Sequence, residues 1–524
     1  MGIAAGCLLA GKILMHYFQL ESYQFPGYFR TVRRNILKSI LPGLCMTVLL
    51  AVSMQLISLN VSENNRPWYL YLAEIVIIIT GGYFIGNSFS EKQAKKAFVI
   101  TPRVKRLYAT SFIVLSFLLI LLAGSVKGRI AGALILVFPA LLPVLIALCG
   151  LLAWPLEKII SELYFRDAQR ILKERSDMLR IGITGSWGKT SVKFILGTIL
   201  GEKYQTLVTP ASFNTPMGVT KVIRSKLEPG HRIFIAEMGA RHVGDIKEMC
   251  RLVHPHIGIL TSVGPQHLDT FKTLERITKT KYELINALPA DGEAFFADDD
   301  GICRKLSDKT EKKKHISGLD SQKDDVWAEE IIYSPEGSRF LLCTAEQKIP
   351  CSTELLGELN IRNILLCASV ALSLGLTMDQ ISRGIRKIKP IEHRLQLIRH
   401  PGGLNVIDDA FNSNIRGAGQ AFDVLKQFPK KRIVVTPGMV ELGEHEAELN
   451  REFGQAMADC CDTVILVGRK RSEAIRNGLL EGGFPENDIR IVSSLSEATE
   501  ILKEISEAGD TVLFENDLPD KYTE

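Results

Sequence analysis

The residues Ile181 to Lys193 read IGITGSWGKTSVK, a short apolar run followed by a turn that glycines bracket. A loop that binds phosphate needs glycines whose backbone can wrap an anion, a following helix N-terminus whose N–H groups point at the anion, and a lysine for the terminal phosphates. The stretch supplies these groups, and a hydroxyl for Mg²⁺, in the order Gly185, Gly188, Lys189 and Thr190. It therefore predicts a strand, a phosphate-binding loop and a helix.

The loop departs from the most common phosphate-binding pattern at its first position. The pattern G-x-x-x-x-G-K-[ST] requires Gly at position 183, where this chain has Ile183. With Thr184 at its start, the loop instead resembles the T-G-[ST]-x-G-K-[ST] sequence of the Mur ligases, the ATP-dependent amide ligases of bacterial cell-wall synthesis. The resemblance implies that the nucleotide is ATP and that its binding residues include Gly185, Ser186, Gly188, Lys189, Thr190 and Ser191.

Two downstream stretches agree with this family in order and spacing, most closely with the branch that adds D-alanyl-D-alanine. AEMGARHVGDI, residues 236–246, resembles the E-M-G-A stretch of the branch and implies that Glu237 is a magnesium ligand. TSVGPQHLDTF, residues 261–271, resembles N-I-G-x-x-H-L-E and implies that His267 binds a second metal ion. The resemblance thus implies that Thr190, Glu237 and His267 all contact metal.

A third stretch, TKTKYELI at residues 278–285, resembles the A-K-x-E-I helix, whose lysine is carbamoylated in the family. Lys281 is the implied carbamate and Lys279 is the competitor. A carbamate turns a cation into an oxygen ligand that can help to hold Mg²⁺. A lysine on a charged helix is commonly only solvated, so the matched order of the stretches carries this assignment.

Later motifs extend the resemblance toward the C-terminus. LGELNIRNILLCA, residues 356–368, resembles the G-x-H-N-x-x-N helix start, which places Asn363 at the asparagine that contacts ATP. Leu359 replaces the histidine of the family. In EHRLQ, residues 392–396, the resemblance implies that Arg394 contacts phosphate.

VIDDAFNSNIRG, residues 406–417, resembles the D-D-x-Y-N-A-N-P stretch, which closes on the nucleotide from the last domain. Asp408, Asp409, Asn412 and Asn414 match, whereas Phe411 and Ile415 replace the Tyr and the Pro. TPGMVELGEHE, residues 436–446, resembles G-D-M-x-E-L-G-E with an altered first half. Together with Lys189, Lys281, His267, Glu237 and Arg394, these residues are the expected catalytic and nucleotide-binding groups.

The soluble part alternates short apolar runs with helical patterns, which predicts mostly parallel sheets covered by helices. The first set of runs is MLRIGIT, QTLVT, RIFIAEM, HIGILTS and EAFFAD, and the second is LNVIDD, RIVVTPG, TVILVG, IRIVSS and TVLFEN. Between the sets, residues 325–354 read as short hairpins. We expect a Mur-ligase central domain with the phosphate loop at 178–398 and a Rossmann-like C-terminal domain at 399–524, both α/β.

The N-terminal part is expected to be an α-helical membrane domain, residues 1–155, with about five spans. Four segments lack charge, or nearly so, over about the twenty residues that cross a hydrocarbon core: Ser39 to Leu59, Tyr69 to Asn87, Leu107 to Val126, and Ile130 to Pro155. Gly2 to Met15 could be a signal sequence, but no cleavage site follows it, so we expect a short fifth span. Residues 156–177 form an amphipathic connector that could lie on the bilayer.

The loop charges predict an orientation, because Lys and Arg accumulate on the cytoplasmic side. The connections at 16–38 and 88–106 carry four and six such residues, whereas the alternate loops carry one and two. This distribution favours a multi-pass protein of the bacterial cell membrane with its catalytic domains in the cytoplasm. Glu74 lies inside the third span, where a carboxylate is costly, although its place near the end of the apolar run lets it reach toward the headgroups.

Composition limits the partners. The chain has 524 residues and a net charge of +5, but residues 1–155 carry 14 Lys and Arg against 4 Asp and Glu, which leaves −5 for the rest. The excess base thus belongs to the hydrophobic part and gives no reason to expect nucleic acid. Ten scattered cysteines without a C-x-x-C pair suit a reducing compartment.

The resemblance implies that ATP phosphorylates a substrate carboxylate and that the amine of an amino acid or dipeptide then attacks the acyl phosphate. A ligase of the D-alanyl-D-alanine branch has a domain for the uridine nucleotide sugar before its phosphate loop, and here a connector and apolar spans stand there. We therefore expect a lipid-linked or polymeric acceptor at the membrane. Three alternatives stay open: a ligase of that branch acting on its usual UDP-linked tripeptide, a poly-amino-acid capsule ligase, and an ATP-driven transporter or switch. The scarcity of intramembrane charge disfavours transport.

Overall fold

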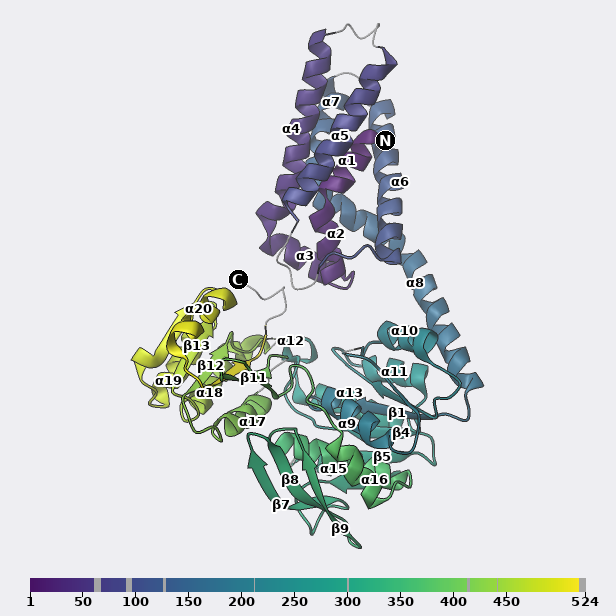
Figure 1. Ribbon diagram of the computed structural model, residues 1–524. Helices are drawn as coiled ribbons and strands as arrows, with labels where there is room; N and C mark the ends of the chain where they lie inside the picture. Colours follow the sequence, from purple (N-terminus) through teal and green to yellow (C-terminus); the bar gives the residue numbers. More distant parts are fainter. Residues whose placement is uncertain are drawn as a thin grey trace. The chain divides into compact units, whose positions relative to one another are not determined.

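The computed structural model describes residues 1–60, 67–90, 97–125, 129–211, 213–298, 301–411, 415–440 and 442–517. The chain divides into two compact units, and the boundary along the chain lies between Leu163 and Tyr164 (Figure 1). The predicted ATP-contacting residues Asn412 and Asn414 lie outside the described residues.

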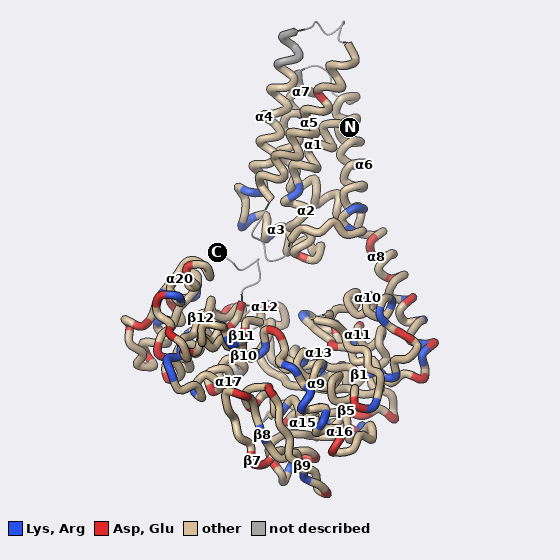
Figure 2. The backbone as a smooth tube through the Cα atoms, viewed as in Figure 1, with Lys and Arg blue, Asp and Glu red and all other residues tan. Residues whose placement is uncertain are grey.

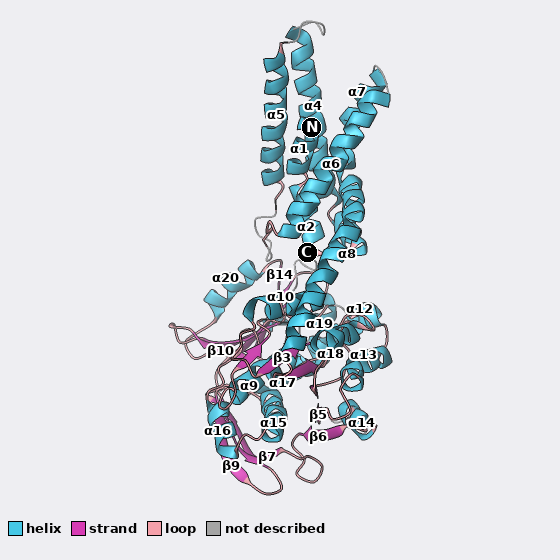
Figure 3. Cartoon of the chain, turned by 90° about the vertical axis from the view of Figure 1, so that its right-hand side faces the viewer, coloured by secondary structure: helices cyan, strands magenta, loops and turns pink. Residues whose placement is uncertain are grey.

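The first unit consists entirely of helices within the described residues (Figure 3). In chain order these are α1 (Gly2–Ala10), α2 (Lys12–Leu20), α3 (Phe25–Arg34), α4 (Ile36–Asn60), α5 (Trp68–Ser88), α6 (Pro102–Ser125), α7 (Arg129–Val137), the 3₁₀ turn η2 (Phe138–Leu141) and α8 (Leu142–Glu174). Four helical segments, α4, α5, α6 and the run from Ile130 to Glu174, are long and apolar enough to cross a membrane. The four predicted spans therefore fall on helices of sufficient length.

The predicted fifth span is not one straight helix. α1 and α2 meet at Gly11 with a bend of 52°. Gly11, with φ −75° and ψ 12°, leaves the helical conformation between them. The pair counts as a further span only if the two bent halves are taken together.

Glycines bring α1 and α5 into backbone contact. A Cβ added at Gly82 would lie 2.3 Å from the carbonyl oxygen of Gly6, and one added at Gly86 would lie 2.0 Å from that of Leu9. Small residues allow this close approach between helices in an apolar surrounding, where there is little hydrophobic drive for association. α1 is thus packed into the core of the unit, with Ala4, Cys7 and Leu8 among its buried residues.

Charge is distributed unevenly along the first unit (Figure 2). Lys and Arg gather around α3 and the start of α6, whereas the long stretches of α4, α5 and α6 carry few charges. Glu74 lies in the second turn of α5 and is partly buried. This pattern is the one that the sequence predicts for basic loops at one end of a helical membrane domain.

α8 runs without a break through Pro155 into the predicted connector. From Phe165 onward its apolar side chains, including Ala168 and Leu172, belong to the hydrophobic core of the second unit. The second half of the predicted connector thus packs against the protein, whereas Leu156, Ile159 and Leu163 in its first half are exposed.

The second unit begins with a six-stranded parallel sheet in the order β2-β3-β1-β4-β5-β6. The strands are β1 (Leu179–Thr184), β2 (Thr206–Val208), β3 (Ile233–Glu237), β4 (Ile257–Leu260), β5 (Glu293–Ala297) and β6 (Lys313–Ser317). Because side chains alternate along a strand, Ile233 and Ile235 face one core while Phe234 and Ala236 face the other.

Helices cover both faces of this sheet. On one face lie α9 (Lys189–Leu200), α15 (Glu358–Ser373) and α16 (Met378–Arg386), and on the other lie the end of α8, α10 (Pro216–Lys226), α11 (Asp245–Val253) and α13 (Leu274–Asn286). The short helices α12 (Leu268–Phe271) and α14 (Ile302–Asp308) complete the set. A three-stranded antiparallel sheet of β7 (Trp327–Ser334), β8 (Gly337–Cys343) and β9 (Lys348–Thr353) contributes to the first of these cores, in the region predicted as hairpins.

A second six-stranded sheet has the order β10-β11-β15-β12-β13-β14, in which only β10 is antiparallel to its neighbour. Its strands are β10 (Gln396–Arg399), β11 (Asn405–Asp409), β12 (Arg432–Thr436), β13 (Thr463–Val467), β14 (Ile489–Val492) and β15 (Thr511–Glu515). Between them come α17 (Ile415–Leu425), η3 (Gly443–His445), α18 (Glu446–Met457), α19 (Ser472–Glu481), η4 (Glu486–Asp488) and α20 (Leu495–Ile505). The sheet includes β10, which starts at Gln396, before the predicted boundary at residue 399.

Candidate active site

The predicted phosphate loop lies where the first sheet changes direction. β1 is flanked by β3 on one side and β4 on the other, so the loop after β1 opens at the topological switch point of the sheet. Ligands of open α/β sheets bind at this position, beyond the carboxyl ends of the strands. The same edge also carries Glu237 at the end of β3 and Thr261 after β4.

The loop itself has the backbone that its glycines allow. Gly188 has a φ of +80°, and an added Cβ there would lie 2.9 Å from Oδ1 of Asn363. Lys189 begins α9 and folds back over the loop, where its ammonium donates hydrogen bonds to the carbonyl oxygens of Gly185 at 2.7 Å and Ser186 at 2.9 Å. Burial lowers the pKa of Lys189 to about 8.

The strand end after β4 holds the loop in place. Ser186 accepts a hydrogen bond from the N–H of Gly264 at 3.0 Å, and the N–H of Trp187 donates to the hydroxyl of Ser262 at 2.8 Å. The N–H of Ser186 also donates to the carbonyl oxygen of Ser262 at 3.0 Å. Sequence reasoning used the stretch around Ser262 only to locate His267 and did not foresee that it would support the loop.

Glu237 is the centre of a buried polar cluster. It is 1% exposed, and its Oε2 accepts hydrogen bonds from Thr190 Oγ1 at 3.1 Å and Lys193 Nζ at 2.9 Å. Its Oε1 accepts from Asn214 Nδ2 at 3.0 Å. The structure therefore brings the predicted metal ligands Thr190 and Glu237 together.

Two members of this cluster were not predicted. Lys193 is one helical turn beyond Lys189, a spacing that places both on one side of α9 and could have identified it. Asn214 lies in a stretch rich in Pro and Thr before α10, which gave no recognisable signal.

The charges around Glu237 favour its ionised form. Burial alone would raise the pKa of this carboxyl, but the positive charges of Lys193 and Lys189 outweigh burial and the pKa is lowered. Arg394, from beyond the central helices, also acts on Glu237 through its charge. The predicted groups Lys189, Glu237 and Arg394 thus share one electrostatic environment.

Lys281 and Lys279 differ sharply in their surroundings. Lys281, on α13, is 2% exposed, whereas Lys279 is exposed. Burial, and secondarily the charge of Lys189, lowers the pKa of Lys281 well below its usual value. Within the described ranges its ammonium has no hydrogen bond or ion pair. A neutral amine near the phosphate loop is therefore favoured at Lys281.

The oxygen ligands of the cluster fit a magnesium ion. Mg²⁺ is usually held by one or two carboxylates together with substrate phosphates and water, rather than by a full set of protein ligands. Thr190 and Glu237 provide a hydroxyl and a carboxylate 3.1 Å apart beside the loop. Among the described residues, no group of three or more His, Cys, Asp or Glu side chains could hold a metal. His267 follows β4 and precedes α12, with a φ of +52°.

A cavity of about 90 Å³ opens beside the loop, lined by Trp187, Thr261, Ala297, Asp298, Glu358, Leu359, Arg362, Asn363, Gly417 and Gln420. Two buried polar atoms in this lining have no hydrogen-bond partner among the described residues: the amide nitrogen of Asn363 and the amide oxygen of Gln420. One is a donor and the other an acceptor, as a nucleobase edge requires. Asn363, the predicted ATP contact, thus lies beside the loop, while Gln420 was not predicted.

The remaining predicted residues that the structure describes lie on β11, which carries Asp408 and Asp409, and in the turn before β10, which carries Arg394. Arg394 donates to the carbonyl oxygen of Phe411 at 2.6 Å and lies over its ring at 4.4 Å. Burial raises the pKa of Asp409 to about 6, and the charge of Arg394 opposes this shift. Asp408 pairs with Nδ1 of His393 at 2.8 Å. The structure thus joins Arg394 and Asp409 in one cluster, with Asp408 next to Asp409 on β11.

Comparison with known proteins agrees with this geometry. Residues 183–371 match the model of the Mur ligase middle domain, and residues 393–515 match that of the Mur ligase glutamate ligase domain. The chain belongs to the Mur ligase family. It is therefore an ATP-dependent amide ligase related to the MurF branch.

Curated Mur ligases resemble this chain at about 30% identity. The UDP-N-acetylmuramoyl-tripeptide--D-alanyl-D-alanine ligase of Escherichia coli strain K12 is 29% identical over 334 residues, which cover 62% of this chain and 74% of that protein. The protein of the same name from Bacillus subtilis strain 168 is 28% identical over 340 residues, 64% of this chain and 72% of that one.

Solved Mur ligases share the fold. MurF of Thermotoga maritima, in complex with ADP, has a TM-score of 0.62 and 25% identity, and the match covers 69% of this chain and 81% of that chain. MurF of Acinetobacter baumannii has a TM-score of 0.63 at 23% identity, covering 69% and 78% of the two chains.

Proposed function

We propose that this Mur ligase is anchored in the membrane and joins an amino acid or dipeptide amine to a carboxylate that a membrane-borne acceptor carries. The observation that supports the chemistry best is the arrangement of Glu237. Its carboxylate lies between the hydroxyl of Thr190 and the ammonium of Lys193, beside a phosphate loop and close to a buried lysine. This arrangement supports phosphoryl transfer rather than passive binding of a nucleotide.

In this proposal the residues of the loop hold ATP by its phosphates. Lys189 leaves the carbonyl oxygens of Gly185 and Ser186 and turns its ammonium to the terminal phosphates, and the N–H groups at the start of α9 contact the same anion. When Mg²⁺ is bound, it supplies positive charge against the phosphoryl group in transfer. Thr190, Glu237, His267 and a carbamoylated Lys281 would hold it.

Residues of the C-terminal domain complete the site. Arg394 and Asp409 form one cluster, and the charge of Arg394 acts on Glu237. We propose that Arg394 contacts the transferred phosphate, that Asp408, Asp409, Asn412 and Asn414 position the nucleotide, and that Asn363 contacts the base. Closure around the substrate would exclude water, which would otherwise hydrolyse the acyl phosphate.

Two observations support an acceptor at the membrane. Four helical segments are long and apolar enough to cross a bilayer, and α8 runs from this apolar region directly into the core that supports the phosphate loop. The acceptor would be lipid-linked or polymeric, and the active site would face the cytoplasm.

ADP release from the detergent-purified full chain tests the ligase chemistry. We expect ADP to form only when an amine and a membrane lipid extract are both present, with a product heavier by the mass of the amine less one water. Lys189→Ala should abolish ADP formation. Rapid ATP hydrolysis without any amine or amide product would contradict the ligase and favour an ATP-driven switch.

A second candidate function rests on the curated relatives. Their printed names describe addition of D-alanyl-D-alanine to UDP-N-acetylmuramoyl-tripeptide. The same reaction in this chain would require no lipid, and the helical unit would then serve only as an anchor.

A further inference from the structure

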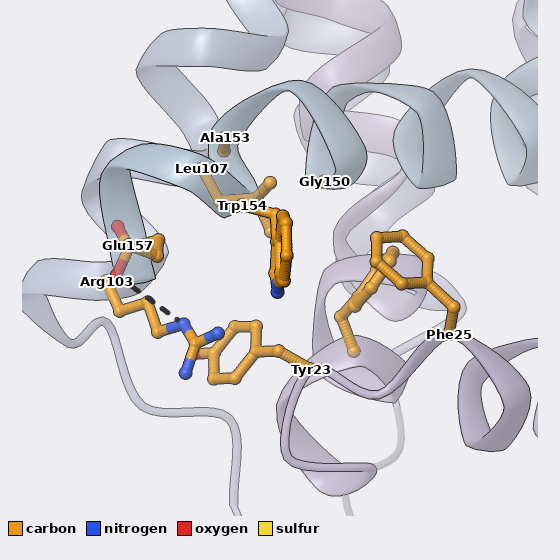
Figure 4. A pocket seen from close by; sticks show the side chains of 9 residues that line it. Tyr23, Phe25, Arg103, Leu107, Gly150, Ala153, Trp154 and Glu157 are labelled. Atoms are coloured by element: carbon orange, nitrogen blue, oxygen red, sulfur yellow. Dashed lines mark ion pairs between the residues drawn. The ribbon is translucent and has the colours of Figure 1, made fainter. Parts of the chain in front are cut away.

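The first unit contains a small pocket, far from the phosphate loop in sequence, whose lining combines aromatic rings with arginine (Figure 4). The pocket has a volume of about 20 Å³ and is lined by Phe18, Tyr23, Phe25, Arg103, Leu107, Gly150, Ala153, Trp154 and Glu157. A cavity of this size admits one or two groups as large as water, such as the oxygens of a phosphate. It is too small for a sugar or a peptide.

The pocket lies at one end of two candidate spans. Arg103 is in the first turn of α6, and Trp154 lies near the end of the apolar stretch of α8. Tyr23 stands between α2 and α3. Trp and Tyr are enriched where a membrane meets water, and basic pockets between spans bind lipid headgroups. The surrounding helix starts and loops belong to the Lys- and Arg-rich end of the unit (Figure 2).

Two arginines lie beside the carboxylate of Glu157, which lines the pocket. Glu157, which is 7% exposed, receives a two-pronged hydrogen bond from Arg106, with Nε at 2.5 Å from Oε1 and one terminal nitrogen at 2.8 Å from Oε2. Arg103 is a second cation for the same carboxylate, with its Nε 3.6 Å from Oε2. Two guanidinium groups thus contact one carboxylate.

Two donors that face this pocket, Arg103 and Trp154, make no hydrogen bond to a described residue, although Arg103 is ion-paired with Glu157 and Lys158 lies over the ring of Trp154. Arg103 stacks on the ring of Tyr23 at 3.9 Å, and in the part of the chain that the structure describes no hydrogen bond reaches its guanidinium. The indole of Trp154 stands beside this pair, with its nitrogen directed toward the ring of Tyr23 and the guanidinium (Figure 4). It also has no hydrogen bond to any described residue. A planar guanidinium with two terminal nitrogens matches the geometry of a phosphate.

We propose that this pocket binds the phosphate group of a membrane lipid and thereby holds the lipid-linked acceptor. The guanidinium of Arg103 and the indole N–H of Trp154 donate to the phosphate oxygens. Arg106 keeps Glu157 paired, so the phosphate does not meet a free carboxylate. The acceptor role rests on the proposed function, whereas the lipid site does not.

Native mass spectrometry of the full chain, titrated with hexadecyl phosphate in neutral detergent, tests the site without ATP or amine. We expect wild-type protein to bind hexadecyl phosphate and Arg103→Gln to bind it at least about tenfold more weakly. Arg103→Lys should have an intermediate affinity, because lysine keeps the charge but lacks the paired, coplanar N–H donors of arginine. Lys105→Gln is the matched control, since it removes one charge from an exposed position on the same helix turn and should bind like wild type.

Two results would overturn the site. One is equal binding of hexadecyl phosphate to wild type and Arg103→Gln, and the other is equal binding of hexadecanol, which has the chain without the phosphate. If Arg103→Gln fails to fold, as its thermal unfolding will reveal, Tyr23→Leu removes the ring beneath the guanidinium and should also weaken binding. Unchanged affinity in Tyr23→Leu would likewise contradict the proposal.

Competition identifies the source of the phosphate. Hexadecyl phosphate that binds in the presence of excess phosphatidylglycerol supports an acceptor role, whereas equal competition by phosphatidylglycerol overturns that role and assigns the pocket to bulk phospholipid. Failure of the proposed function gives a different result: amide would form only on a soluble carboxylate, while binding of hexadecyl phosphate would still depend on Arg103.

Discussion

Lys281 and Lys279 lie on one helix, but only Lys281 is suited to become a carbamate. Carbamate formation needs a neutral amine, and burial lowers the pKa of Lys281 well below its usual value. Lys279 is exposed to solvent. The fold thus favours Lys281 over Lys279 through a difference in burial that the sequence does not show.

We predict that Lys281→Ala loses ligase activity and that short carboxylates such as acetate or formate restore part of it, because they replace the carbamate oxygens at the metal. Removal of CO₂ from the buffer should lower the activity of wild type. Initial rates of ADP release measure both effects. Lys279→Ala is the matched control and should keep wild-type activity; the opposite pattern in the two variants would move the carbamate to Lys279.

The lowered pKa of Lys189 predicts that ATP binding takes up a proton at high pH. Its pKa of about 8 means that the ammonium loses its proton as the pH rises through this value in the nucleotide-free protein. The phosphates of ATP favour the charged form, so binding should take up close to one proton at about pH 9 and almost none at about pH 6. ATP affinity should fall over the same interval.

Isothermal titration calorimetry in buffers of different ionisation enthalpy measures this uptake. Lys189→Arg provides the control, since arginine stays protonated and the uptake near pH 9 should disappear. Proton uptake that is equal in wild type and Lys189→Arg would show that another group titrates.

The residues that sequence reasoning found and those it missed differ in kind. Glu237 and Asn363 stand in stretches with a recognisable order, and the structure places both beside the loop. Asn214 and Gln420 reach the site only because separate strands and helices converge there. Such contacts depend on tertiary packing, which local sequence does not record.

At the scale of elements, the phosphate loop depends on a glycine that cannot be replaced. Gly188 has a φ of +80°, where a side chain is strained by about 1–2 kcal/mol, and a Cβ would meet the side chain of Asn363. We predict that Gly188→Ala raises the KM for ATP at least about tenfold, because every 1.4 kcal/mol of lost binding is a factor of about ten.

Gly483→Ala is the matched control for this variant. Gly483 has a φ of +81° and no atom within 4 Å of an added Cβ, so the backbone strain is the same but the site is untouched. Thermal unfolding should show a similar loss of stability in both variants, with a change in KM only for Gly188→Ala. Equal KM values would mean that the loop tolerates a side chain.

Burial explains which strands could be predicted from the sequence. All ten apolar runs proposed as strands of the two large sheets became β1 to β5 and β11 to β15, because a buried parallel strand is a continuous apolar run. β6 and β10 were missed. Both are edge strands, as are the predicted β2 and β14, and their sequences KKHIS and QLIR contain only one and two apolar residues.

Helices of the first unit show the limit of hydropathy. The composition of Gly2 to Met15 predicted a span, but it does not specify the 52° bend at Gly11 or the contact of α1 with the glycines of α5. Likewise the apolar face of the connector was visible in the sequence, but its partner was not. Amphipathicity predicts that a face is covered and leaves open whether lipid or protein covers it.

At the scale of the whole molecule, an ATP-dependent Mur ligase and a set of apolar helices share one chain. α8 connects them without a break, and its last turns are built into the core below the phosphate loop. This order, helical unit first and ligase domains second, could be predicted from the sequence because the two differ in composition and in the periodicity of their apolar residues. The identity of the acceptor has no such signature, since it depends on side chains from several elements.

The most direct test of the proposal follows radiolabelled amine through the reaction of the full chain. The enzyme is given ATP, labelled D-alanyl-D-alanine or amino acids, and both a membrane lipid extract and a soluble UDP-muramyl tripeptide, and the mixture is then extracted with organic solvent. We predict that the label enters the organic phase in an ATP-dependent manner that Lys189→Ala abolishes. Label that appears only in the aqueous phase, on the UDP-linked peptide, would contradict a membrane-borne acceptor.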